Sequence, residues 1–356
     1  MKALPAWARR DVVRDAAAIP VLIVGFLMLL AMGTEYQYPA ADDALFAGTG
    51  GDYHETYYGV HGSGGVYPLR IKYHDSPGYR GPPVIIVHGM GTSDAYLWRV
   101  EGEVDVFAGF IFAERRRLEA AGLAQGLADL GVDVVTYTYP DSRDRPLEYQ
   151  AYDLGRVTGW TKDRFVKKDV VLVGHSTGGL ICYYYLVSGQ PGRVNYQFPA
   201  ADHPEYAWNP SYNVSDYDLK HFRYQYDVAR LFLVATPNLG NLTPEGRDYG
   251  SPALFEMKEN ADFLTWLEEG RRRAAAERYV WPDVYVFAGT AFEKYMGQNP
   301  LNFGDGIVTV ASAVGNWEED PRCRGRVYRY PLDHFQLAMD GGVLATIYNA
   351  LAGPGN

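Results

Sequence analysis

Residues 169–179 read DVVLVGHSTGG, and this stretch decides the fold. The short apolar run Val170–Val173 has the length of a buried strand, and the apolar residues Leu180–Val187 continue as a helix. Between them lies the pattern G-x-S-x-G, centred on Ser176. A serine on such a sharp strand-to-helix turn exposes its hydroxyl, and the amides at the helix N-terminus favour a developing negative charge. The stretch predicts a catalytic serine; a glycine-rich turn of an ordinary α/β domain is the alternative.

Composition limits the classes of function. The chain has 356 residues, 47% of them hydrophobic, which is enough for a large core. The net charge of −10, without a basic stripe, argues against nucleic acid as a partner. The two cysteines, Cys182 and Cys323, cannot form a disulfide framework, although one bridge is open to them outside the cytoplasm. Neither has metal-ligand spacing, and Cys182 is expected to be a small buried packing residue.

The N-terminal residues 1–34 are predicted to be a signal peptide or a membrane anchor. An uncharged segment, residues 16–34, follows several basic residues and contains IPVLIVGFLMLLAM. Basic residues before an apolar segment predict export of the chain that follows. Its apolar length lies between that of a signal peptide and that of a spanning helix, and a candidate cleavage site follows Gly33. We therefore expect an exported protein, either anchored in the membrane or secreted or periplasmic after cleavage; a buried core helix is the alternative.

The remaining chain is expected to fold as an α/β domain. Residues 35–68, rich in Gly, Tyr and Ala, are interpreted as a linker and entry segment, and residues 69–356 as the catalytic domain. Alternating strands and helices predict a mostly parallel central sheet with helices on both faces. Strands are expected at 69–73, 84–87, 132–139, 170–173, 229–235, 284–288 and 326–330. Helices are expected at 113–130, 147–165, 180–187 and 337–351, and a helical pair or a bent helix at 251–269.

Two segments interrupt this alternation. Residues 190–226 are crowded with Tyr, Asn, Pro and Asp and predict a long ordered insertion. Residues 239–280 contain the apolar helical pattern 251–269, which predicts a cap. Both are expected to cover the site and to supply an acyl or aromatic pocket, and the second could move as a lid.

The nucleophile needs a base. In folds of this kind the chain order is serine, acid, histidine. Three histidines follow Ser176 at a distance, and two of them, His203 and His221, lie in the polar insertion before two further strands. His334 follows the last predicted strand and precedes the closing helix. His334 is therefore the predicted general base.

The base in turn needs a carboxylate that orients it. Asp305 lies in a Gly-Asp-Gly loop after the strand 284–288, at the end where an acid is needed. Asp283 precedes that strand, Asp333 abuts the histidine, and Asp320 lies in a charged run expected to be solvated. Asp305 is the predicted acid.

An oxyanion hole needs two backbone N–H groups that face the serine. One is expected from Thr177, directly after the nucleophile, and the other from Met90, in the loop after the first core strand. His88 is expected to hold this loop, and His175 to pack beside the serine turn.

Four separated segments carry a family resemblance. They are VHGMG at 87–91, GHSTGG at 174–179, ATPNLGN at 235–241, and DGIV with DHFQ at 305–308 and 333–336. With these motifs the chain resembles the α/β-hydrolase superfamily, and within it the bacterial triacylglycerol lipases and esterases. The resemblance spans residues 69–351, and residues 251–267 are similar to the cap region of that family. In such lipases the third motif is usually T-P-H-x-G, and Asn238 replaces that histidine here.

The resemblance and the residues together predict a serine hydrolase that cleaves carboxylic esters, with a small-molecule or lipid ester as substrate. A polyester depolymerase or an acyltransferase is an alternative, and the same triad allows a peptidase or amidase. A membrane-tethered binding protein on an inactive hydrolase fold is the alternative without catalysis. No cofactor is implied. Some relatives bind calcium near the histidine loop, but no full set of ligands is evident here, so no metal is expected.

Overall fold

The computed structural model describes residues 53–62, 65–90, 94–107, 113–139, 145–203, 206, 213–240, 251–277, 281–291 and 304–352. Residues 101–107 and 113–119 belong to one compact unit, and the other described residues belong to a second unit. The predicted signal peptide or anchor, 1–34, lies outside the described residues and stays a prediction. Across the described ranges, no helix has both the length and the apolar character needed to cross a membrane.

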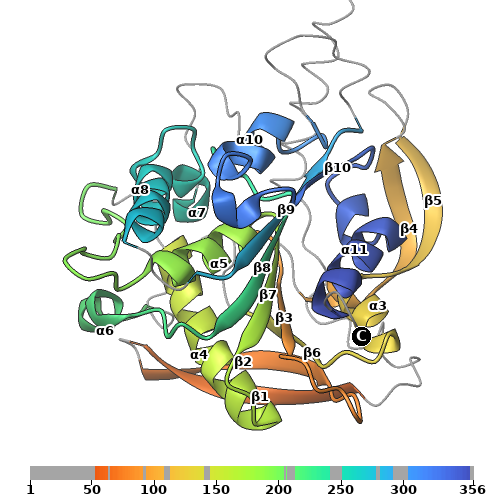
Figure 1. Ribbon diagram of the computed structural model, residues 1–356, viewed down its shortest axis with the longest axis horizontal. Helices are drawn as coiled ribbons and strands as arrows, with labels where there is room; N and C mark the ends of the chain where they lie inside the picture. Colours follow the sequence, from red (N-terminus) through yellow and green to blue (C-terminus); the bar gives the residue numbers. More distant parts are fainter. Residues whose placement is uncertain are drawn as a thin grey trace, which may run out of the picture. The chain divides into compact units, whose positions relative to one another are not determined.

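The second unit is built on a sheet of eight strands (Figure 1). Their order across the sheet is β1-β2-β6-β3-β7-β8-β9-β10. The pairs β1–β2 and β2–β6 are antiparallel, and every other pair is parallel. The mostly parallel α/β sheet predicted from the sequence is therefore confirmed. The strands are β1 (Tyr53–Gly62), β2 (Gly65–His74), β3 (Val84–Val87), β6 (Val134–Thr138), β7 (Val170–His175), β8 (Val228–Val234), β9 (Asp283–Gly289) and β10 (Val327–Tyr330).

Helices cover both faces of this sheet. In Figure 1, α3 and α11 lie on one side of the strands, and α4 and α5 lie on the other. The helices are α2 (Ala95–Trp98), α3 (Leu123–Asp129), α4 (Leu147–Phe165), α5 (Thr177–Val187), α6 (Asp216–His221), α7 (Pro252–Glu256), α8 (Asp262–Ala276), α10 (Val310–Val314) and α11 (Gly341–Ala352). Short 3-10 turns follow at η3 (Gly315–Trp317), η4 (Pro321–Cys323) and η5 (Gln336–Ala338).

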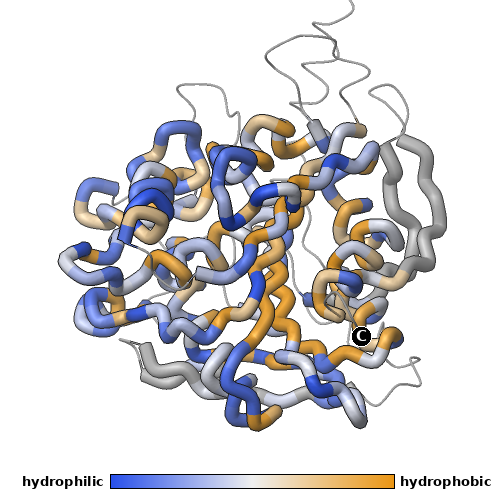
Figure 2. Tube along the Cα trace, in the orientation of Figure 1, coloured by the Kyte–Doolittle hydropathy of each residue, from blue (hydrophilic) through white to orange (hydrophobic). Residues whose placement is uncertain are grey.

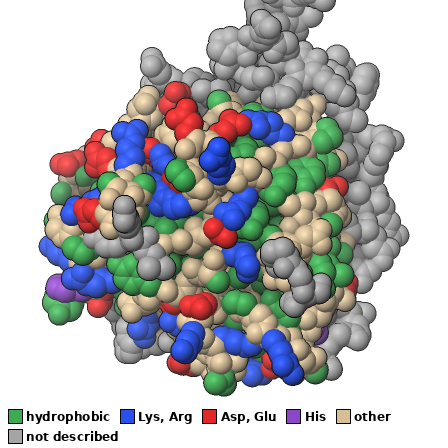
Figure 3. Space-filling model, in the orientation of Figure 1, with side chains coloured by type: hydrophobic (Ala, Val, Ile, Leu, Met, Phe, Trp, Pro, Cys, Tyr) green, Lys and Arg blue, Asp and Glu red, His purple; other side chains and the backbone are tan. Residues whose placement is uncertain are grey.

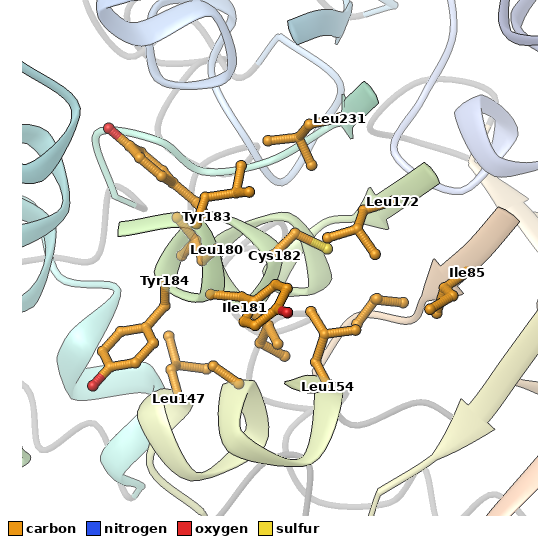
Figure 4. Close-up of a cluster of buried hydrophobic side chains, with 14 of the residues drawn as sticks. Ile85, Leu147, Leu154, Leu172, Leu180, Ile181, Cys182, Tyr183, Tyr184 and Leu231 are labelled. Carbon is orange, nitrogen blue, oxygen red and sulfur yellow. The ribbon is translucent and has the colours of Figure 1, made fainter. Parts of the chain in front are cut away.

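The core lies between the central strands and α5. Figure 2 shows the most apolar backbone segments along these strands, and all residues of β3 and β7 are buried. Every residue of α5 is buried as well. In Figure 4, Ile181 and Cys182 of α5 lie between Leu172 of β7 and Leu154 of α4. A helix that is apolar on all sides is typical of one enclosed by other elements, and α5 is enclosed in this way.

The predicted helix at 113–130 is wrong over most of its length. Residues Ala113–Ala121 form strand β5, which pairs with β4 (Arg99–Phe107) in a separate two-stranded sheet, and only α3 is helical. The sequence AERRRLEAA is rich in helix formers, but β4 reads RVEGEVDVF and alternates like a strand. Pairing with a strand neighbour overrides such a weak local preference.

Part of the predicted linker and entry segment, 35–68, forms strand β1. Strand β1 occupies ten residues of it and pairs with β2 along its whole length, from Tyr53 opposite His74 to Gly62 opposite Gly65. Its sequence YHETYYGVHG is rich in Tyr, Thr and Val, which favour strands. The folded domain therefore begins upstream of residue 69.

A pair of buried carboxyl groups connects the insertion and the cap to α4. Glu148 of α4 accepts a hydrogen bond from the Phe198 amide in the insertion (2.6 Å), and Glu256 of α7 accepts one from the Leu147 amide (2.7 Å). Both glutamates are fully buried and hydrogen-bond each other. Burial and the neighbouring Glu148 raise the pKa of Glu256 well above its usual value, and burial also raises that of Glu148, so the two carboxyl groups share a proton. This contact fastens the insertion and α7 to α4.

Of the two alternatives for 251–269, a helical pair or a bent helix, the structure shows the pair, α7 and α8. Residues 241–250 of the cap lie outside the described residues. The role of the insertion 190–226 and of the cap 239–280 in covering the site stays a prediction.

A buried ion pair ties strand β2 to α4. Arg145 Nη1 donates to Asp153 Oδ2 at 2.5 Å, and Arg145 Nη2 donates to the Tyr67 hydroxyl at 2.6 Å. The Tyr67 hydroxyl donates to the other carboxylate oxygen of Asp153 at 2.5 Å. The side chains of Arg145 and Asp153 are fully buried, so each charge depends on the other for its compensation.

Cys182 and Cys323 are buried free thiols, and the expected packing role of Cys182 in the core is confirmed. On the face shown in Figure 3, Lys and Arg side chains are interspersed with Asp and Glu.

Candidate active site

Ser176 occupies the turn between β7 and α5 with a strained backbone. Its φ of 55° and ψ of −128° lie in a region that non-glycine residues rarely adopt. The flanking glycines allow this turn, because a Cβ on Gly178 would lie 2.2 Å from the Val87 carbonyl oxygen and one on Gly174 would lie 2.4 Å from Gly179 Cα. The structure thus forms the nucleophile turn that the motif predicts.

The loop after β3 lies directly against this serine. A Cβ built on Gly89 would lie 3.0 Å from Ser176 Cβ and 3.4 Å from its Oγ. The neighbouring Met90 amide donates to Thr177 Oγ1 at 3.2 Å. Thr177 is the first residue of α5, where backbone N–H groups have no partner within the helix. The structure therefore brings both predicted oxyanion residues together beside Ser176.

His334 and Asp305 are hydrogen-bonded to each other. The His334 Nδ1–Asp305 Oδ2 distance is 2.8 Å, and both side chains are buried. The other carboxylate oxygen of Asp305 accepts from the amides of Ile307 (2.9 Å) and Val308 (2.7 Å), and the Asp305 carbonyl accepts from the His334 amide (3.0 Å). These bonds fix the carboxylate against the imidazole.

The histidine loop meets the serine turn through His175. The rings of His175 and His334 have their centroids 4.9 Å apart, and the His334 carbonyl accepts a hydrogen bond from His175 Nε2 at 2.9 Å. His175 is the chain neighbour of Ser176. Residues that follow β3, β7, β9 and β10 therefore converge at the carboxyl edge of the sheet, where sites of open parallel sheets lie.

The two remaining histidines of the motifs are buried and kept neutral. Burial lowers the pKa of His88 to about 4, and burial together with His334 lowers that of His175 to about 3. His88 stacks on the Tyr139 ring, with centroids 4.1 Å apart, and its Nδ1 donates to the Gly89 carbonyl at 2.8 Å. These contacts agree with the expected structural roles of both residues.

Tyr96 belongs to the site and was not predicted. Its hydroxyl contacts His175 Nδ1 at 2.7 Å and the Gly89 amide at 3.3 Å. It lies on α2, a single turn of helix that is too short to give a periodic pattern in the sequence. The only sequence signal is its closeness to the predicted loop that begins at His88.

The rejected candidates have other partners in the structure. The His203 ring packs against Phe255, with centroids 4.4 Å apart, and His221 is exposed on α6. Asp333 accepts hydrogen bonds from the amides of the two residues after His334. The expectation that Asp320 is solvated is wrong, because it is 2% exposed. It was expected to face water as part of a charged run, but it accepts hydrogen bonds from two arginines, Arg271 and Arg322.

Asn238 takes the place of the histidine in the third motif. Its side chain is buried, and its amide donates to the Ala313 carbonyl at 2.6 Å. It thus holds the loop after β8 against α10. Within the described ranges, no group of three or more His, Cys, Asp or Glu residues could hold a metal ion.

Comparisons with known proteins place this geometry in a family. The model of the alpha/beta hydrolase family matches residues 84–349. A search of curated protein sequences finds no match. Among solved structures, the mature Bacillus licheniformis lipase BlEst2 is 15% identical, with a TM-score of 0.46, over 78% of this chain and 96% of that chain.

Two further solved structures are similar at comparable levels. The Pyrococcus furiosus esterase Pf2001 is 12% identical, with a TM-score of 0.41, over 79% of this chain and 83% of that chain. A membrane phospholipase A, described as a bacterial virulence factor, is 14% identical, with a TM-score of 0.40, over 97% of both chains. The family model spans most of the chain and all of the residues that converge at the site, and the protein is therefore a member of the alpha/beta hydrolase family.

Proposed function

We propose that this hydrolase cleaves carboxylic esters through an acyl-serine intermediate, with Ser176 as nucleophile, His334 as general base and Asp305 as the orienting acid. The observation that carries the proposal is the convergence of a serine in a strained strand-to-helix turn with a buried His334–Asp305 pair. Such a set of serine, base and orienting carboxylate activates a hydroxyl that is otherwise a weak nucleophile.

The hydrogen bonds define the proton positions that the reaction needs. The Asp305 carboxylate accepts only, so His334 Nδ1 carries the proton of the neutral imidazole. Nε2 is then left as the atom that takes the proton from Ser176 and later returns it to the leaving alcohol. The carboxylate also stabilises the imidazolium that forms in between.

Charge that develops on the ester oxygen would be held by the Thr177 and Met90 amides. The Met90 N–H is bonded to Thr177 Oγ1. An oxyanion at this place would accept from the same N–H, so the hydroxyl has to give up that bond as the tetrahedral intermediate forms. Loss of one such donor costs about 10²–10³ in kcat in other acyl-transfer enzymes.

For the substrate, we favour a lipid ester. The apolar segment 16–34, predicted to direct export, would keep an uncleaved protein next to a membrane. The aromatic insertion and the apolar helices of the cap supply the kind of side chains that line acyl pockets.

The test uses a fluorophosphonate probe on wild-type protein and on Ser176→Ala, followed by p-nitrophenyl esters from acetate to palmitate. We expect labelling of wild type that disappears in the variant, and turnover that the variant lacks. The chain-length profile, measured with and without detergent, separates an esterase from a lipase. Folded wild-type protein that is neither labelled nor active under any of these conditions would refute the proposal.

A further inference from the structure

A chain of hydrogen bonds connects the loop after β3 to the loop that carries His334. It begins at the Gly89 amide, which donates to the Tyr96 hydroxyl at 3.3 Å. The Tyr96 hydroxyl lies 2.7 Å from His175 Nδ1, and His175 Nε2 lies 2.9 Å from the His334 carbonyl oxygen. The loop that supplies the oxyanion donor Met90 is thus connected to the loop that carries the base.

The direction of every proton in this chain follows from its two ends. A carbonyl oxygen only accepts, so His175 Nε2 must carry a proton and donate it to His334. A neutral imidazole then has a lone pair at Nδ1, which must accept from the Tyr96 hydroxyl. The Tyr96 hydroxyl uses its single proton in the bond to His175. It therefore accepts in its contact with Gly89, where the backbone N–H is the donor. The arrangement is consistent at every link.

The surroundings of His175 preserve this pattern. The side chain is 1% exposed, and burial together with the nearby His334 lowers its pKa to about 3. His175 therefore stays neutral when His334 takes up the proton of the serine. A protonated His175 would lose the lone pair at Nδ1 and break the link to Tyr96.

We propose that Tyr96 and His175 are positioning residues of the hydrolase site, which hold the oxyanion loop (88–90) and the histidine loop (333–335) as one unit. This inference deepens the proposed function and rests on it. Neither residue touches the reacting atoms. They act through the Gly89 amide, next to the oxyanion donor Met90, and through the carbonyl of His334 itself.

The predicted effect is on the reaction step more than on binding. Removal of the Tyr96 hydroxyl would free both loops to shift, and a displacement of about 1 Å at a catalytic group costs as much as 10²-fold in rate. We expect Tyr96→Phe to lower kcat by about 10–10²-fold, with KM within about twofold. Tyr185→Phe is the matched control, because it also removes a hydrogen-bonded tyrosine hydroxyl, one that donates to Asp227 at 2.8 Å away from the site.

Two substitutions of His175 separate positioning from packing. His175→Leu removes both hydrogen bonds, whereas His175→Gln retains a side-chain N–H that can reach the His334 carbonyl. We expect His175→Leu to lose at least as much kcat as Tyr96→Phe, and His175→Gln to recover part of the loss. Because both residues belong to one chain, Tyr96→Phe combined with His175→Leu should cost no more than His175→Leu alone.

Amide hydrogen exchange tests the connection without turnover. In Tyr96→Phe, peptides that cover 85–90 and 330–337 should both exchange faster, because the Tyr96 hydroxyl is bonded to the first segment and to His175, which is bonded to the second. Faster exchange confined to 85–90, a kcat equal to that of Tyr185→Phe, or additive losses in the double variant would overturn the inference. Wild-type protein without esterase activity would refute the proposed function, and the exchange result would still decide whether the chain couples the two loops.

Discussion

Replacement of Asp305 by asparagine would move the proton of the neutral His334 imidazole from Nδ1 to Nε2. Asp305 Oδ1 accepts from the amides of Ile307 and Val308, and Oδ2 faces His334 Nδ1 at 2.8 Å. The asparagine carbonyl can keep both amide bonds only if its NH2 group points at His334. That group donates, so Nδ1 has to accept, and the imidazole proton moves to Nε2. An Nε2 that already carries a proton cannot take one from Ser176.

The magnitude follows from this wrong tautomer. In a serine protease the equivalent change lowers kcat about 10⁴-fold with the geometry intact, which corresponds to about 5.4 kcal/mol of transition-state stabilisation at 1.36 kcal/mol per decade. We expect a loss of this order for Asp305→Asn. The loss of stability should be far smaller, because both amide bonds remain and only the charge-assisted bond to His334, about 1.5–3 kcal/mol, is weakened.

The assay is kcat with a p-nitrophenyl ester, together with thermal unfolding of each variant. Asp333→Asn is the matched control, since Asp333 adjoins His334 in the chain and accepts from the amides of Phe335 (3.0 Å) and Gln336 (2.8 Å), contacts that an asparagine carbonyl can keep. We expect its kcat to stay within a few-fold of wild type. A variant Asp305→Asn with near-normal kcat, or equal losses in both variants, would refute the assignment of Asp305 and the reasoning about the tautomer.

Four further substitutions test the packing of the fold. Gly178→Ala should lower stability by at least about 1–3 kcal/mol, because its Cβ would lie 2.2 Å from a carbonyl oxygen of β3, whereas Gly159→Ala in α4, with nothing within 4 Å of its Cβ, should gain about 0.5–1 kcal/mol. Glu256→Gln should be more stable than wild type above about pH 5, by an amount that grows by up to about 1.4 kcal/mol per pH unit, since its amide can donate permanently to Glu148. Arg145→Met should cost about 3–5 kcal/mol, since it leaves a buried carboxylate without its counter-charge.

Thermal and urea unfolding check all four. For Glu256 the sign follows from linkage: its pKa is raised in the folded state, so the native protein keeps a proton that the unfolded chain releases, and stability is lost as pH rises above the ordinary glutamate pKa. Equal slopes of stability against pH in wild type and Glu256→Gln would contradict a shared proton. A stable Gly178→Ala, or an Arg145→Met variant as stable as wild type, would contradict the packing described for those positions.

Much of the fold could be predicted because its strongest signals are local. Val84–Val87 and Leu147–Phe165 have the lengths and apolar patterns of a buried strand and a long helix, and both were predicted at their observed bounds. Ala113–Ala121 was predicted wrongly, because its helix-forming composition is overridden by a partner strand that only the folded chain provides.

The same distinction applies to the site. Ser176, Asp305 and His334 each follow a strand of the parallel sheet, in the chain order that hydrolases of this fold use, so their convergence could be anticipated from the chain alone. Tyr96 could not be anticipated, since its place depends on how a single turn of helix meets His175, a contact 79 residues apart in sequence. Polar contacts between loops leave no periodic pattern in a sequence.

The complete burial of α5 has a consequence for how the protein would lose activity on heating. The strained turn at Ser176 is held by a helix that cannot fray, because all of its residues are enclosed by the sheet, α4 and α8. Segments of this kind exchange their amides only through global opening. Inactivation and cooperative unfolding should therefore occur at the same temperature, with no intermediate in which the turn at Ser176 alone is unfolded and the rest of the domain stays folded.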